Sequence, residues 1–136
     1  MPDEEEQNGK LLAGLCYVPI SPINLVAILY VLLANKGGKY ARFHAVQSML
    51  LILVFSIISL LIQLPFMLAF AKLFTNFPFS PADFQAAWAQ AFAFMVPLMV
   101  FGIVFFLVFF YFAIQAFQGK SFRIPVITDL AGRVVK

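Results

Sequence analysis

The chain has 136 residues, of which 63% are hydrophobic and only 11% are charged, and its formal net charge at pH 7 is +3. Soluble domains carry about 25% charged residues, so this composition excludes an ordinary soluble domain. The basic residues flank long apolar stretches, which accounts for the positive charge without a nucleic-acid partner. Cys16 is the only cysteine, which excludes an intrachain disulfide and a multi-cysteine metal site.

Residues 1–9 form a polar, acidic tail, and residues 10–136 are predicted to form a single transmembrane domain. That domain contains three apolar stretches without a charged residue, at about 11–34, 45–71 and 84–118. Each stretch exceeds the ~20 residues that a helix needs to cross a hydrocarbon core of ~30 Å. Because a backbone in lipid must satisfy its own polar groups, each should be helical. The sequence therefore predicts an all-α membrane protein with three transmembrane helices.

The first stretch is interrupted by Pro19, Ser21 and Pro22. Proline lacks a backbone donor and clashes with the preceding helical turn, so we expect a kink or a short unwound segment within residues 17–24. One interpretation is a packing kink that neighbouring helices satisfy. The other is a broken helix that lines a polar cavity, as in transporters.

The second stretch carries a stripe of polar side chains on one helical face. The members of this stripe are His44, Ser48, Ser56, Ser59 and Gln63. Such side chains can join helices through hydrogen bonds that average ~0.6 kcal/mol each. Alternatively, Ser48, Ser56, Ser59 and Gln63 line a polar path through the membrane.

The third stretch and the tail each begin with a recognisable signal. Ser80, Pro81 and Asp83 form a typical helix start, with a capping serine, a proline in the first turn and an acidic residue three positions after the serine. In the tail, 121–136, the apolar residues Val126, Ile127, Leu130 and Val134 recur at helical spacing. This pattern predicts a C-terminal amphipathic helix that lies in the membrane interface.

The basic residues predict an orientation. Seven of the nine fall on one side of a three-span arrangement, namely Lys36, Lys39, Arg42, Lys120, Arg123, Arg133 and Lys136. Loops rich in Lys and Arg stay cytoplasmic. We therefore expect a multi-pass protein of the cell membrane, with its N-terminus outside and its C-terminus in the cytoplasm.

Residues for catalysis or metal binding are scarce. His44 is the only histidine, and no carboxylate pair lies inside an apolar stretch. Proton-coupled carriers usually carry ionisable residues within the membrane, so their absence argues against such a carrier. We expect no enzyme activity, no metal site and no cofactor.

Two short segments resemble a known family. In segment 40–51, YARFHAVQSMLL, an Arg-Phe-His step precedes a glutamine at the start of an apolar stretch, and segment 125–129 reads Pro-Val-Ile-Thr-Asp. Together they resemble the small Tic translocon membrane proteins of the chloroplast inner envelope and their prokaryotic relatives, over about residues 11–130. The family-like interface residues are Arg42, Phe43, His44, Gln47, Pro125, Thr128 and Asp129.

The resemblance implies a non-enzymatic translocon-like or scaffold subunit, associated with protein import or membrane-protein handling. Its partners would be the lipid bilayer and either another protein or a second copy of the chain. Two interpretations of Arg42 and Asp129 stay open: either they pair at the cytoplasmic interface, or Arg42 contacts a lipid phosphate and Asp129 caps a helix. The competing function is a small transporter or channel, with a path lined by the broken first helix and the Ser/Gln face of the second.

Overall fold

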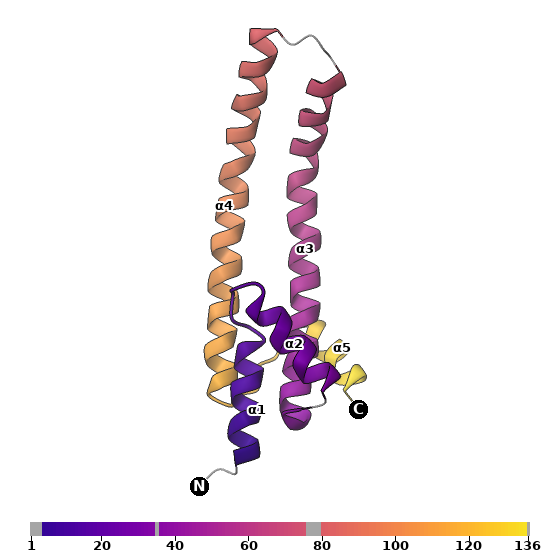
Figure 1. Cartoon of the computed structure of the whole chain (residues 1–136), viewed down its shortest axis with the longest axis vertical. Helices are drawn as coiled ribbons and strands as arrows, with labels where there is room; N and C mark the ends of the chain where they lie inside the picture. The colour runs from indigo at the N-terminus through magenta and orange to yellow at the C-terminus, as the bar shows by residue number, and fades with distance from the viewer. Residues whose placement is uncertain (1–3, 35, 76–79, 136) are drawn as a thin grey trace. The chain divides into compact units, whose positions relative to one another are not determined.

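The computed structural model describes residues 4–34, 36–75 and 80–135, and within these ranges every regular element is a helix (Figure 1). The all-α prediction is therefore confirmed for the described residues. The helices are α1 (Glu4–Leu15), α2 (Ile23–Leu33), α3 (Gly38–Thr75), α4 (Pro81–Phe117) and α5 (Ile127–Val134).

Two of these helices, α3 and α4, are long and apolar enough to cross a membrane, by length and composition. They contain the second and third predicted stretches. At 1.5 Å per residue, the 38 residues of α3 and the 37 residues of α4 each extend over about 55 Å. Both helices continue through an internal proline, Pro65 in α3 and Pro97 in α4.

The first predicted span is not one helix. The expected break is confirmed: residues 16–22 form turns that separate α1 from α2. The 11 residues of α2 cover only about 17 Å, which is less than the ~30 Å of a hydrocarbon core. A third crossing helix is therefore not confirmed. The N-terminal acidic tail predicted for residues 1–9 is helical in part, because Glu4, Glu5 and Glu6 form the first turn of α1.

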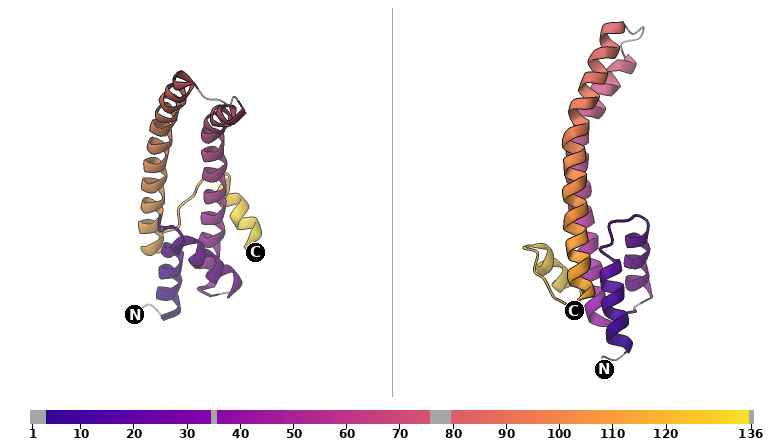
Figure 2. Two further views of the ribbon diagram at one scale, coloured as in Figure 1. Left: turned by 45° about the horizontal axis from the view of Figure 1, so that its top comes forward. Right: turned by 90° about the vertical axis from the view of Figure 1, so that its left-hand side faces the viewer.

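Helices α1 and α2 form an antiparallel hairpin (Figures 1 and 2). The start of α1 lies against the connection that follows α2, since a Cβ placed on Gly9 would lie 2.9 Å from the carbonyl oxygen of Gly37. Gly37 has a φ of +84°, a conformation that glycine adopts without strain. The chain therefore turns back on itself before α3 begins.

The described residues pack as two compact units. The first contains the chain up to Leu53 and from Phe106 onward, and the second contains Val54–Phe105. In the second unit, Phe55 of α3 packs against Phe101 and Phe105 of α4, with ring centroids 5.4 and 4.9 Å apart. The prediction of a single transmembrane domain is not tested by this division, because α3 and α4 each contribute to both units.

The start of α4 follows the prediction. The Ser80 hydroxyl accepts a hydrogen bond from the Asp83 amide at 3.1 Å. The Asp83 carboxylate in turn accepts bonds from the Ser80 amide at 3.1 Å and from the Ser80 hydroxyl at 2.7 Å. This reciprocal pair satisfies backbone donors that have no partner within the helix.

The buried side chains of the first unit come from all five helices and from the turn after α1. They include Ala13, Cys16, Tyr17, Ala27, Ile28, Val31, Ala41, His44, Ala45, Gln47, Ser48, Phe109, Ala113, Ala116, Ile127 and Ala131. Figure 2 shows α5 and the α1–α2 hairpin on opposite sides of the α3 and α4 segments of this unit. Many of these core residues are alanines, so the helices approach one another closely.

The α1–α4 contact gives a first testable prediction. A Cβ on Gly14 would overlap the ring of Phe117. Overpacking of this kind costs about 1–3 kcal/mol. We expect Gly14→Ala to lower the midpoint of heat-induced aggregation of the detergent-solubilised protein. Gly102→Ala is the matched control, because a Cβ there would meet no atom of the described residues within 4 Å and alanine favours a helix interior. An unchanged midpoint for Gly14→Ala would contradict the observed contact.

Candidate functional site

A chain of buried polar side chains connects three segments of the first unit. The Tyr17 hydroxyl donates to Gln47 Oε1 at 3.0 Å, and Gln47 Nε2 donates to Thr128 Oγ1 at 3.0 Å. Tyr17 lies in the turn after α1, Gln47 in α3 and Thr128 in α5. Tyr17 and Gln47 are 0% exposed. Gln47 therefore joins the hairpin to the C-terminal helix through both atoms of its amide.

His44 extends this chain by one contact. Its Nδ1 lies 3.4 Å from the Tyr17 hydroxyl oxygen. Because that hydroxyl has one hydrogen and donates it to Gln47, the contact requires Nδ1–H as the donor, which leaves a lone pair on Nε2. Nε2 is buried and has no hydrogen-bond partner among the described residues. The rings of Tyr17, Tyr40, Phe43 and Phe122 lie around the imidazole, with centroids at 5.8, 4.5, 5.5 and 5.2 Å.

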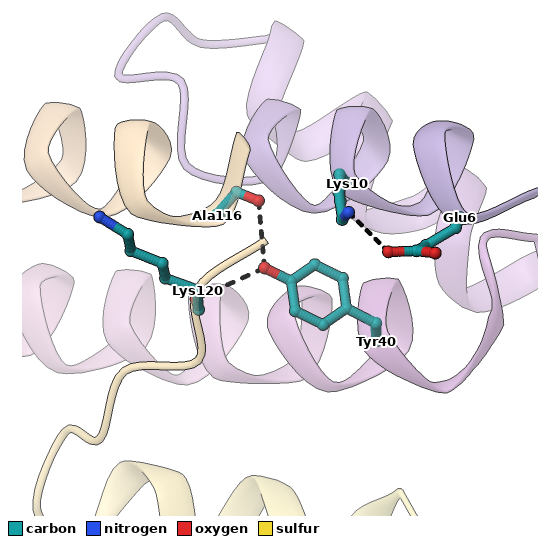
Figure 3. A network of polar contacts seen from close by, with 5 residues as sticks. All are labelled: Glu6, Lys10, Tyr40, Ala116 and Lys120. Carbon is teal, nitrogen blue, oxygen red and sulfur yellow. Dashed lines mark hydrogen bonds and ion pairs between the residues drawn. The ribbon is translucent and has the colours of Figure 1, made fainter. Parts of the chain in front are cut away.

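Two further hydroxyl groups of α3 satisfy backbone carbonyls at the ends of other helices. Ser48 Oγ donates to the carbonyl oxygen of Cys16 at 2.6 Å. Tyr40 Oη donates to the carbonyl oxygen of Ala116 at 3.0 Å and lies 3.4 Å from that of Lys120, as Figure 3 shows. The last carbonyls of a helix have no partner within the helix. Tyr40 and Ser48 thus compensate the ends of α4 and α1, respectively.

The turn before α5 is strained and closed by Thr128. Val126 has φ 68° and ψ −50°, which is rare for a β-branched residue. The amide of Ile127 bonds the carbonyl oxygen of Pro125 at 2.8 Å, which makes this a γ-turn of the strained type. Thr128 closes it: its hydroxyl oxygen accepts from the Ile124 amide at 2.7 Å, and its own amide donates to the Ile124 carbonyl at 2.9 Å. Gln47 therefore holds α5 at the residue that also closes the strained turn.

The structure brings together some of the family-like residues and separates others. Phe43, His44, Gln47 and Thr128 lie in or against the buried network. Pro125 and Asp129 are exposed, and Arg42 is half-buried. The expected Arg42–Asp129 pair is wrong, because within residues 4–34, 36–75 and 80–135 the ion pair formed is Lys10–Glu6, at 2.6 Å.

Of the four residues predicted to line a polar path, three take part in hydrogen bonds and one, Ser56, is exposed. Ser48 bonds Cys16 as described, and Gln63 Nε2 donates to Ser59 Oγ at 2.7 Å one helical turn away. Ser56 is exposed. The bond of Ser48 joins two segments, and the bond of Gln63 lies within one helix. Neither bond tests whether a polar path runs along these side chains.

Sequence reasoning missed three members of the site: Tyr17, Tyr40 and Phe122. Tyr17 is one of the few polar side chains in the first apolar stretch and lies two residues before Pro19. A buried phenol needs a hydrogen-bond partner, so this position was a detectable signal. Phe122, which stacks on Phe112 with centroids 4.5 Å apart, follows a glycine turn and has no comparable signal.

Metal ligands are not gathered in the described part of the chain: within it, no group of three or more His, Cys, Asp or Glu side chains is placed to hold a metal ion.

These features define a class: a small helical membrane protein with two long apolar helices, in which a buried polar network joins a short helical hairpin and a C-terminal helix to the ends of α3 and α4. The family model described as the magnetosome magnetite crystal formation protein family (MamF/MmsF) matches residues 7–131. The chain belongs to this family. Comparison with curated proteins and with solved structures gave no match.

This membership corrects the resemblance drawn from the sequence. The matching family is not the Tic translocon family, so the predicted role as a translocon-like subunit in protein import is wrong. What remains from that prediction is the membrane location of a helical protein. Of the residues that carried the resemblance, Phe43, His44, Gln47 and Thr128 belong to the packing of the first unit, and none of them identifies a translocon.

The amide of Gln47 gives a second testable prediction. Gln47→Leu leaves the hydroxyl hydrogen of the buried Tyr17 without this acceptor, which costs about 1–3 kcal/mol. It also removes the bond to Thr128, whose hydroxyl oxygen keeps the bond from the Ile124 amide. We expect a lower unfolding midpoint in detergent and faster hydrogen exchange of the α5 amides.

Gln63→Leu is the matched control, because Gln63 lies in the same helix and its hydrogen bond among the described residues is to Ser59, one turn away. Equal effects of the two substitutions would show that Gln47 does not hold α5.

Proposed function

We propose that this chain is a membrane-embedded protein that takes part in magnetite crystal formation at the magnetosome. The observation that carries the proposal is the family match over residues 7–131, which begins within α1, includes all of α2, α3 and α4, and ends within α5 at Ala131. The two apolar helices α3 and α4 support a location in the membrane. In this role the protein acts without catalysing a reaction of its own, and its partners are the bilayer and either another membrane protein or a second copy.

The arrangement of the helices favours a different orientation from the one expected for three spans. If only α3 and α4 cross, both termini lie on the same side of the membrane. The seven basic residues counted above and Lys10 then share that side, which leaves only Lys72 on the other. Because Lys and Arg mark the cytoplasmic side, we propose that the termini, the α1–α2 hairpin and α5 are cytoplasmic.

Cysteine labelling distinguishes the two orientations. In a Cys16→Ser background, we expect an impermeant thiol reagent to reach Ala82→Cys from one side only and Gln7→Cys, Lys39→Cys and Gly132→Cys from the other side only. The decisive comparison is Gln7→Cys with Lys39→Cys, since three spans place these positions on opposite sides and two spans place them on the same side. Labelling of Gln7→Cys together with Ala82→Cys would overturn the two-span arrangement.

The role in crystal formation is tested by gene deletion in a magnetite-forming host. We expect the deletion to change the size or number of magnetite crystals seen by electron microscopy, and the wild-type gene to restore them. Complementation with Gln63→Leu should restore the crystals, whereas Gln47→Leu should do so less well at equal protein level in the membrane. Crystals that are unchanged by the deletion would contradict the proposed function.

A further inference from the structure

A cavity of about 670 Å³ lies beside the start of α3, between the hairpin and the α2–α3 connection. Its walls come from α1, from Tyr30 of α2 and from residues 36–40. This volume is within the range of ligand sites, which is about 300–1,000 Å³. All of its lining residues belong to the first unit. The buried network described above does not line the cavity, except through Tyr40.

The charges at the cavity leave an excess of positive charge. Lys36, Lys39, Glu5 and Glu6 line it. Glu6 is neutralised by Lys10, with the carboxylate and ammonium 2.6 Å apart. Lys36 and Lys39 form no ion pair within the described residues. The lining itself contains two lysines and two glutamates. When Lys10, which pairs with Glu6 from outside the lining, is counted as well, the local charge is +1, opposite in sign to the single negative charge of a phosphate diester.

The cavity also has apolar walls, and these distinguish a lipid from a free anion. Leu11 and Tyr30, both lining residues, are 53% and 50% exposed, and Leu12 completes this wall. Inorganic phosphate would leave these side chains in water. A molecule with a phosphate and an attached hydrocarbon part would cover them and gain about 25 cal/mol per Å² of apolar surface removed from water.

The position along α3 agrees with a lipid headgroup. The lysines lie immediately before and at the start of α3, and its uncharged apolar stretch begins at Ala45. Basic pockets beside transmembrane helices on the cytoplasmic side are a known type of lipid headgroup site. Lysine binds phosphate as a point charge, and the first amides of α3 add donors without a partner in the helix.

We propose that this cavity binds a glycerophospholipid, with Lys36 and Lys39 on the phosphate and with Leu11, Leu12 and Tyr30 against the glycerol and upper acyl region. Glu5 is left to accept a hydrogen bond from a hydroxyl or amine of the headgroup. The site gives the protein a fixed lipid at the base of its hairpin, in addition to the general contact of α3 and α4 with the bilayer.

The test is calorimetric titration of the full-length, detergent-solubilised protein with dioctanoyl phosphatidylglycerol. We expect the wild-type protein to bind this lipid saturably. The double variant Lys36→Gln/Lys39→Gln should bind it about tenfold or more weakly, since two charge-assisted bonds are removed. The double variant Lys36→Arg/Lys39→Arg should retain the binding. Lys120→Gln is the matched control, because this lysine lies at the end of α4 and outside the cavity, and it should change affinity less than about twofold by comparison. Because Lys36 and Lys39 are both exposed, their substitution should not disturb the fold. An unchanged unfolding midpoint of the variants, measured without lipid, verifies this.

Two further ligands identify the source of the phosphate. Dioctanoylglycerol lacks the phosphate and should not bind saturably, and inorganic phosphate should neither bind with comparable affinity nor displace the lipid. Equal weakening by Lys120→Gln and by the double variant would overturn the site in favour of general attraction to a basic surface. Binding of inorganic phosphate as tight as that of the lipid would overturn the lipid assignment, and the absence of saturable lipid binding would overturn the proposal altogether.

Discussion

The hydrogen bond from Tyr17 to Gln47 is the contact on which the first unit depends. The helix breaks between α1 and α2, where Pro19 and Pro22 lack backbone donors, and the chain turns back over residues 16–22. A turn leaves backbone and side-chain polar groups that are costly to bury without partners. Tyr17 brings its hydroxyl from this turn to Gln47, while Ser48 reaches the carbonyl of Cys16 at 2.6 Å. The polar face at the start of α3 is thus matched to the polar groups of the turn.

The same glutamine transmits this constraint to the opposite side of the unit. Its amide nitrogen bonds Thr128, which closes the strained turn at Val126. Helix α5 then packs through Ile127 and Ala131, which are buried, while Val126, Leu130 and Val134 remain 68%, 44% and 67% exposed. The predicted apolar stripe of the tail therefore has two parts. Ile127 faces the protein, and the other three residues form a separate stripe at i, i+4 and i+8 that suits the membrane interface.

The sequence was informative wherever one interaction dominates. Long uncharged stretches predict α3 and α4, because lipid allows no other structure for such a backbone. The Ser80–Asp83 cap and the break near Pro19 follow from local rules. The hairpin was not predictable in the same way, because the length of 11–34 suits a single crossing and only packing shows that the chain turns back. The network was half predictable: the stripe on α3 was visible, but its partner Tyr17 and the Gln47–Thr128 bond depend on tertiary contacts.

The mistaken family resemblance has the same physical origin. It rested on Arg42, Phe43, His44 and Gln47 and on the Pro-Val-Ile-Thr-Asp step, and the structure places Gln47 and Thr128 of these segments in direct hydrogen bonding. In this chain these two residues fasten the C-terminal helix to the start of α3, which is a packing role. A motif that solves a packing problem indicates an architecture, whereas function resides in sites that differ between proteins of one architecture. Evidence for the function of this chain therefore has to come from residues outside the network, and the cavity beside Lys36 and Lys39 is built, apart from Tyr40, from residues of that kind.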